Sequence, residues 1–217
     1  MKLSAIQTAI LACALTCAPV LAEETSAAAE VFGIPIKGDV LIVIVASSTM
    51  DEPFALHSRL GVCVEEVIRG IENLPAGTKF NVAAVDEGLH WNDGFYQLHP
   101  ATAEHKNSLI TALEQLETGE GSNFEIALAL PIVFTPRPTQ VVLISDGSPE
   151  TFAHVDEIEK LVEAGIRVDC VGFEQTRREA GRLREIAHPS GGKFNYADPP
   201  QAKAAPEPEI VARSGIE

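Results

Sequence analysis

Continuous apolar runs alternate along the chain with segments in which apolar residues recur every three or four positions. The run VLIVIVA at 40–46 is continuously apolar and mostly β-branched, which is typical of a strand covered on both faces. From Leu56 to Ile71 the spacing is helical, and Pro75 and Gly77 end that helix. The same patterns predict further strands at 79–85, 94–98, 140–145, 167–173 and 193–196, and further helices at 103–116, 124–134, 154–164 and 176–187.

This order of elements predicts an α/β fold class. Strands that are separated by helices usually lie parallel in one sheet, with the helices packed on both of its faces. We therefore expect a three-layer α/β/α domain of the Rossmann-like type, with a doubly wound, mostly parallel sheet of about six strands. The short segment at 94–98 is expected to be an antiparallel strand at one edge of the sheet.

The two ends of the chain differ from the rest in composition. Residues 1–22 combine Lys2, an apolar run and small residues up to Ala22, which indicates a secretory signal peptide, with a short membrane anchor as the alternative. Residues 23–35 are interpreted as a polar lead, 36–198 as the domain and 199–217 as a flexible tail rich in Pro and Ala. We therefore expect a protein exported to the periplasm or the medium of a bacterium, with no membrane insertion after signal removal.

Charge narrows the range of partners. Lys and Arg total 16 against 31 Asp and Glu, so the formal net charge is −15. Nucleic acids are poor partners for such a chain, because phosphate contacts need a basic surface. Cationic partners or a metal ion are what this field attracts.

Cysteine usage gives a further expectation. Cys13 and Cys17 leave with the signal peptide, so the exported chain keeps Cys63 and Cys170. Both lie among apolar residues, one in a predicted helix and one in a predicted strand. Two buried free thiols are therefore favoured over a disulfide, although an oxidising compartment leaves the disulfide open.

Polar side chains follow the predicted strands. Ligands of open α/β sheets collect beyond the carboxyl ends of the strands. Ser47 and Thr49 follow the first strand, Asp146 follows the strand at 140–145, and Ser122 lies between two helices. Hydroxyls and carboxylates suit a hard divalent cation. Thr49 and Ser122 could instead cap helices, and Asp146 could simply belong to an Asp-Gly turn.

Five stretches resemble, in order and spacing, the von Willebrand factor type A family. The resemblance implies a metal-ion-dependent adhesion site, in which an Asp and two hydroxyls of the first loop, a Thr of the middle loop and a later Asp hold the cation. It assigns Ser47 and Thr49, Ser122 and Asp146 to these roles, whereas Val45 stands where the first Asp is expected. The stretches are DVLIVIVASSTM at 39–50, GSN at 121–123, VVLISDGSPE at 141–150, AGIRVDCVGF at 164–173 and LREIAHPSGGKFNYA at 183–197.

The missing carboxylate decides between the functions that the resemblance allows. With only Asp146 left in the set, we expect no cofactor and a metal-independent, non-catalytic module that binds another protein. The first alternative is a Mg²⁺-dependent adhesion domain in which Asp51 or Asp86 replaces the missing group. The second is a small secreted hydrolase using Ser145 and Asp146 with a distant His. We expect no enzyme, because the sequence has neither a Gly-x-Ser-x-Gly elbow nor a phosphate-binding loop.

Overall fold

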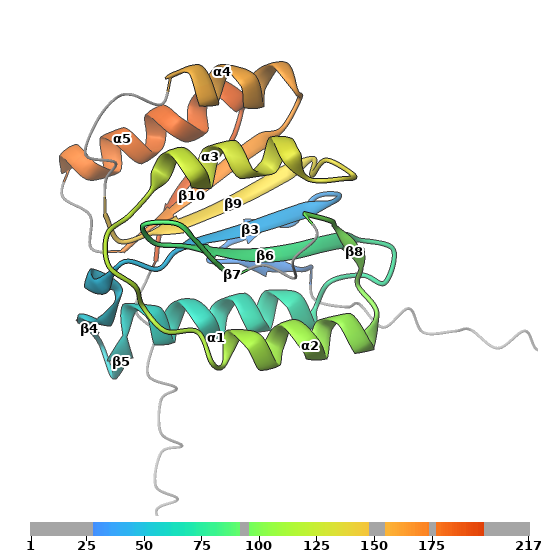
Figure 1. Cartoon of the computed structure of the whole chain (residues 1–217), viewed down its shortest axis with the longest axis horizontal. Helices are drawn as coiled ribbons and strands as arrows, with labels where there is room; N and C mark the ends of the chain where they lie inside the picture. Colours follow the sequence, from blue (N-terminus) through green and yellow to red (C-terminus); the bar gives the residue numbers. More distant parts are fainter. Residues whose placement is uncertain (1–27, 92–95, 148–154, 174–176, 198–217) are drawn as a thin grey trace, which may run out of the picture.

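The structure is a computed structural model that describes residues 28–91, 96–147, 155–173 and 177–197 (Figure 1). The predicted signal peptide at 1–22 and the predicted tail at 199–217 lie outside the described residues.

One seven-stranded sheet forms the centre of the structure, in the order β11-β10-β9-β3-β6-β7, with β8 also paired to β6 (Figure 1). Two of its strands, β3 and β9, are buried along their whole length, as the apolar runs predict. The fold class is therefore confirmed as a doubly wound, mostly parallel α/β sheet. The parallel strands are β3 (Val40–Val45), β6 (Lys79–Val85), β9 (Gln140–Ser145), β10 (Arg167–Gly172) and β11 (Phe194–Tyr196).

The antiparallel edge differs from the expected strand at 94–98. Two short strands, β7 (Leu89–Trp91) and β8 (His99–Pro100), pair antiparallel with β6 on either side of that segment. Gln97 makes only an isolated bridge to Thr135, and Leu98 is buried without belonging to a strand. Residues 94 and 95 lie outside the described residues, and the described part of the prediction, 96–98, is not a strand. Leu98 is apolar because it packs in the core.

Helices cover both faces of the sheet (Figure 1). On one face lie α1 (Arg59–Glu72) and α2 (Ala103–Leu113), and on the other α3 (Phe124–Val133), α4 (Val155–Glu163) and α5 (Arg177–Ala187). Alternate residues of β3 pack into the two apolar layers, Ile42 and Ile44 towards α1, Leu41 and Val43 towards α3. A 3-10 turn, η2 (His188–Ser190), follows α5. No helix in the described ranges is long and apolar enough to cross a bilayer.

The first helix begins three residues later than the apolar spacing predicts. Pro53–Phe54 (β4) and His57–Ser58 (β5) form a small hairpin, and Leu56 at its turn is 84% exposed. The Ser58 hydroxyl accepts a hydrogen bond from the Gly61 N–H and so starts α1 at Arg59. Leu56 therefore does not belong to the buried face of the helix.

The last part of the predicted lead belongs to the folded unit. Glu30–Val31 (β1) and Ile34–Pro35 (β2) form an antiparallel hairpin, and its turn at Phe32 and Gly33 has positive φ at both residues. Val31 and Ile34 are fully buried in the layer that contains α1. The folded unit thus begins before residue 36, because Val31 and Ile34 of this hairpin are part of its apolar core.

The two cysteines lie in different layers of the core. Cys63 packs in the cluster that contains α1, and Cys170 in the cluster on the α3 side of the sheet. Both are fully buried, and both are free thiols. The sheet lies between the two thiols, and the prediction of two buried free thiols is confirmed.

Candidate functional site

The loop after β3 is fixed by its own backbone and by one buried side chain. Ser48–Asp51 form a single 3-10 turn, η1, in which the Met50 N–H donates to the Ser47 carbonyl at 2.9 Å. Met50 is fully buried and anchors the turn in the core. The turn and the buried Met50 therefore fix where the hydroxyls of this loop lie at the carboxyl edge of the sheet.

Three of the four sequence-predicted site residues meet at this edge. The Ser47 hydroxyl donates to Asp146 Oδ1 at 3.1 Å, and its oxygen lies 3.0 Å from the hydroxyl oxygen of Thr49. Asp146 reaches this position because it directly follows β9, the neighbour of β3 in the sheet. Its side chain is only 1% exposed. Ser47, Thr49 and Asp146 thus form one hydrogen-bonded cluster.

A basic side chain that the sequence analysis did not single out completes this cluster. Arg59 Nη1 lies 3.0 Å from Asp146 Oδ2 and 3.2 Å from the carbonyl oxygen of Thr49. The other terminal nitrogen, Nη2, lies 2.9 Å from Glu52 Oε2. The Arg59 side chain is 13% exposed, whereas that of Glu52 is 56% exposed. The two oxygens of Asp146 are therefore divided between Ser47 and the guanidinium of Arg59.

The middle loop comes close to the same edge without joining the cluster. The Gly119 N–H donates to the Ala46 carbonyl at 2.8 Å, and a side chain at Gly119 would collide with the Asp86 carboxylate. Ser122 is exposed, and no hydrogen bond within the described ranges links it to Ser47 or Asp146. The structure brings together three of the four predicted residues and leaves Ser122 apart.

Helix capping does not explain the hydroxyls at this edge. Thr49 lies inside η1, and Ser47, its N-cap, makes no side-chain capping bond. The residue that caps α3 is Asn123, whose side-chain oxygen accepts from the Ile126 N–H at 3.0 Å, and not Ser122. The capping interpretation of Thr49 and Ser122 is therefore wrong.

The side chains at this edge do not fit the cation that the resemblance implies. Val45 is fully buried and packs in the apolar layer with Phe124, so it offers no ligand. The remaining carboxylate, Asp146, already contacts a guanidinium. A hard dication placed on the same oxygens would lie a few ångströms from that positive charge and would be repelled.

The two carboxylates suggested as replacements have other contacts. Asp51 Oδ2 accepts a hydrogen bond from the Thr118 hydroxyl at 2.6 Å, and Asp86 Oδ1 accepts one from the Gly88 N–H at 2.9 Å. Across the residues that the structure describes, no three His, Cys, Asp or Glu side chains are grouped so that they could hold a metal ion. The observed contacts give no support to a cation site completed by Asp51 or Asp86.

The serine of the hydrolase alternative is enclosed in its own turn. Ser145 is 1% exposed, and its hydroxyl accepts from the Gly147 N–H at 3.1 Å. A nucleophile needs access to substrate and a base within hydrogen-bond reach. The burial of Ser145 argues against that role.

A hollow of about 500 Å³ opens beside η1 and continues between α1 and the end of α2. Its floor is apolar, three carboxylates line it, and no Lys or Arg is among its lining residues. The carboxylates belong to Asp51, Glu114 and Glu117, and the apolar side chains to Leu60, Val64, Leu113 and Leu116. This edge therefore offers an acidic, partly apolar surface next to the hydroxyl cluster.

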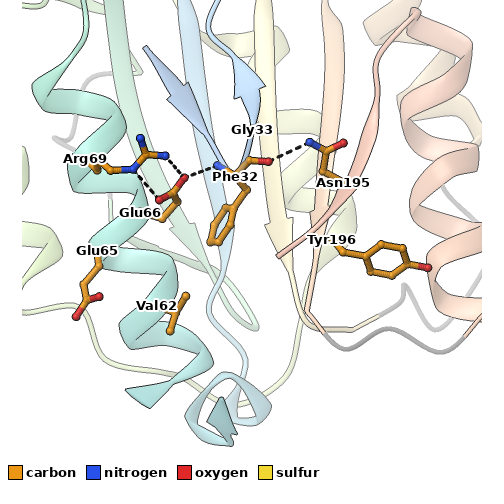
Figure 2. A pocket seen from close by; sticks show the side chains of 8 residues that line it. All are labelled: Phe32, Gly33, Val62, Glu65, Glu66, Arg69, Asn195 and Tyr196. Atoms are coloured by element: carbon orange, nitrogen blue, oxygen red, sulfur yellow. Dashed lines mark hydrogen bonds and ion pairs between the residues drawn. The ribbon is translucent and has the colours of Figure 1, made fainter. Parts of the chain in front are cut away.

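A second hollow, of about 640 Å³, separates the N-terminal hairpin, α1 and β11 (Figure 2). Several of its polar side chains are bonded to the backbone of the hairpin or to one another. Glu66 accepts from the Phe32 N–H at 2.7 Å and pairs with Arg69, and Asn195 Nδ2 donates to the Phe32 carbonyl at 3.0 Å (Figure 2). These contacts hold the hairpin to the domain, so we assign this hollow a structural role.

Fold and site together define a doubly wound α/β domain whose candidate site lies at the carboxyl edge of its sheet. The family model for the von Willebrand factor type A domain matches residues 38–196, and the chain belongs to this family. No curated protein matches the chain.

Solved structures agree with this assignment at the level of the fold. A von Willebrand factor type A protein from Catenulispora acidiphila aligns with a TM-score of 0.66 and 24% identity over 76% of this chain and 40% of its own. An aerotolerance-related membrane protein from Bacteroides fragilis aligns with a TM-score of 0.57 and 18% identity, over 75% of this chain and 92% of its own. Proximal thread matrix protein 1 from the mussel byssus, with a zinc-occupied adhesion motif, aligns with a TM-score of 0.55 and 18% identity, over 74% of this chain and 41% of its own. The chain thus spans less than half the length of the first and third of these proteins.

Proposed function

We propose that this chain is an exported, non-catalytic protein–protein interaction module that binds its partner at the carboxyl edge of the sheet without a metal ion. The observation that carries the proposal is the Arg59–Asp146 ion pair, in which the retained carboxylate of the adhesion site is bonded at 3.0 Å to a cation of the protein itself. The buried Val45, which replaces the other carboxylate, supports the same reading.

The shape of this edge supports protein binding rather than catalysis. Its hydroxyl cluster is held rigidly by η1, and the adjacent hollow has an apolar floor with an acidic rim. Protein interfaces combine buried apolar contacts with polar groups around them. Ser145, the candidate nucleophile, is buried and bonded to its own turn.

Export rests on the sequence of residues 1–22, which has the charge, the apolar run and the small residues of a signal peptide. A module of this kind meets partners in the periplasm or outside the cell. The alternative function, Mg²⁺-dependent adhesion, would require a dication to displace Arg59 from Asp146, and the zinc-occupied motif of the mussel protein is the observation that keeps it as the second candidate.

Site-specific crosslinking tests the proposal. A photo-crosslinking amino acid is placed at Ser48, which is exposed on η1, and at Val162 of α4 as the matched control on the opposite layer. We expect the Ser48 position alone to give a discrete adduct in the exported fraction, with the same yield in the presence of EDTA. Loss of the adduct in EDTA would favour the cation-dependent alternative, and equal adducts at both positions would refute binding at this edge.

A further inference from the structure

Arg59 lies where a cation is normally unfavourable. It is the first residue of α1, directly after the N-cap Ser58, and no acidic residue occupies the first turn of this helix. The amino end of a helix carries a partial positive charge that repels a cation. The Arg59 side chain is nevertheless 13% exposed, so anions outside the helix must hold it there.

One of these anions, Asp146, belongs to the candidate site, and the other, Glu52, lies just after η1. Arg59 Nη1 contacts Asp146 Oδ2 at 3.0 Å and the Thr49 carbonyl at 3.2 Å, and Glu52 holds the other terminal nitrogen at 2.9 Å. The Ser47 hydroxyl binds the second oxygen of Asp146. The positive charge of Arg59 therefore lies beside the one carboxylate that the candidate site retains, whose other oxygen is bonded to the Ser47 hydroxyl.

We propose that Arg59 is a tethered cation that takes the place of the metal ion in this adhesion site. Its guanidinium neutralises Asp146, whose side chain is 1% exposed, and it joins α1 to the loop after β3 and to the end of β9. A buried carboxylate without such a partner is strongly destabilising. This inference rests on the metal-independent binding proposed above. It identifies the Arg59 guanidinium as the positive charge that stabilises the carboxyl edge of the sheet.

The role of Arg59 is tested by replacing its charge with a cation from solution. Because this experiment needs no partner, a negative result would refute the role of Arg59 without bearing on the proposed binding of a partner. Thermal unfolding of Arg59→Ala is compared with that of Arg69→Ala, the matched control on the same helix, whose ion pairs are 48% exposed on the arginine side. Each protein is measured with 10 mM Mg²⁺, with 10 mM methylguanidinium and with NaCl of matched ionic strength.

We expect Arg59→Ala to lower Tm by about 8–12 °C and Arg69→Ala by about 2–4 °C, because the pair at Asp146 is the more buried of the two. At least one of the two cations should raise the Tm of Arg59→Ala by about 2–5 °C, and that of the wild type and of Arg69→Ala by less than about 1 °C. Equal responses of all three proteins, or a response of none, would overturn the proposal.

The double variant Arg59→Ala/Asp146→Asn, compared with both single variants, provides a second test, and a folded double variant supports the proposal even where Arg59→Ala does not fold. Removal of both charges leaves no unpaired buried anion, so the double variant should have a higher Tm than Arg59→Ala and should not respond to either cation. A double variant whose loss of Tm equals the sum of the two single losses would refute the role of Arg59 as the cation of Asp146.

Discussion

Among single residues, Val45 and Arg59 together distinguish this site from one built for a metal ion. Val45 replaces the first carboxylate by an apolar side chain that packs in the core, and Arg59 supplies the positive charge beside Asp146. A change at one of these positions alone is expected to give at most weak binding of a metal ion. Val45 leaves the site without a second carboxylate, and Arg59 occupies the carboxylate that remains.

We therefore predict that Mg²⁺ binds the double variant Val45→Asp/Arg59→Ser more tightly than either single variant. Val45→Asp alone should lower the free energy of unfolding by about 2–4 kcal/mol, since it places a charge at a fully buried position. Calorimetric titration with Mg²⁺ measures the affinities, and thermal unfolding measures the stability.

Tight Mg²⁺ binding by the unmodified chain would contradict this prediction and favour the cation-dependent function. Absence of binding by the double variant would show that the position of Val45 in the loop has been assigned wrongly.

The sequence predicted part of this site and missed the rest for a physical reason. Ser47, Thr49 and Asp146 could be grouped because each follows a strand whose carboxyl end lies at the same edge. Arg59 could not be grouped with them, because its contact depends on the exact start of α1 after the hairpin at 53–58. One signal was present in the sequence, namely a basic residue in the first turn of a helix, where acidic residues are the rule.

At the scale of elements, the packing of the N-terminal hairpin on α1 depends on one glycine. An added Cβ at Gly70 would lie 2.6 Å from Val31 Cγ2 and 3.0 Å from the Glu30 carbonyl oxygen. We predict that Gly70→Ala lowers the free energy of unfolding by about 1–3 kcal/mol, because the hairpin must move away from the helix.

Gly181 is the matched control, since it lies inside α5 with no atom within 4 Å of the added Cβ. Gly181→Ala should raise the free energy of unfolding by about 0.5–1 kcal/mol through helix propensity alone. Urea unfolding measures the free energy of unfolding of the two variants. An increase in both would show that the hairpin leaves room for a side chain at Gly70.

Long elements were predictable because their periodicity extends over several turns or pleats, as in β3 and α1. The hairpins at 30–35 and 53–58 have strands of only two residues, in which no alternation can be recognised. Both are shaped by turns with positive φ at residues other than glycine, Phe32 and Ala55, which local sequence preference disfavours. Tertiary contacts of Val31 and Phe54 with the core decide their conformation.

At the scale of the whole molecule, each of the two apolar layers encloses one protonated thiol. Burial raises the pKa of Cys63 and of Cys170, and nearby carboxylates add to the rise. The folded state therefore keeps both protons at a pH at which the unfolded chain, with thiol pKa values of about 8.5, has lost them. Stability is fully present below that pH and falls above it.

We predict that the free energy of unfolding decreases above about pH 8.5 by up to about 1.4 kcal/mol per pH unit for each thiol. Urea unfolding at pH 7.5, 8.5, 9.5 and 10.5 measures the slope, and the variant Cys63→Ala/Cys170→Ala should show a smaller one. Reaction of either thiol with Ellman's reagent in the folded protein, or an unchanged slope in the variant, would contradict the burial of both groups.

An arginine–aspartate pair is present at each end of the sheet. At the amino end, Asp169 is fully buried and accepts bonds from Arg167, from Gln140 Nε2 at 2.7 Å and from the Lys193 N–H at 2.8 Å. Gln140 in turn donates to the Pro35 carbonyl at 3.1 Å and so holds the N-terminal hairpin. The pair at the amino end has a structural role, whereas the pair at the carboxyl end lies among the candidate ligand loops.

The attachment of Arg59 to α1 also has a thermodynamic consequence for the carboxyl edge of the sheet. A group joined to its site by the chain acts at an effective concentration that is millimolar or higher and is independent of the medium. A dissolved ion would have to compete for Asp146 with Arg59, which is present at this effective concentration. Dilution or chelation would remove the ion but not Arg59. Under the proposed function, the carboxyl edge of the sheet is therefore expected to keep one charge state as the supply of divalent ions rises and falls, so that partner binding there should not depend on that supply.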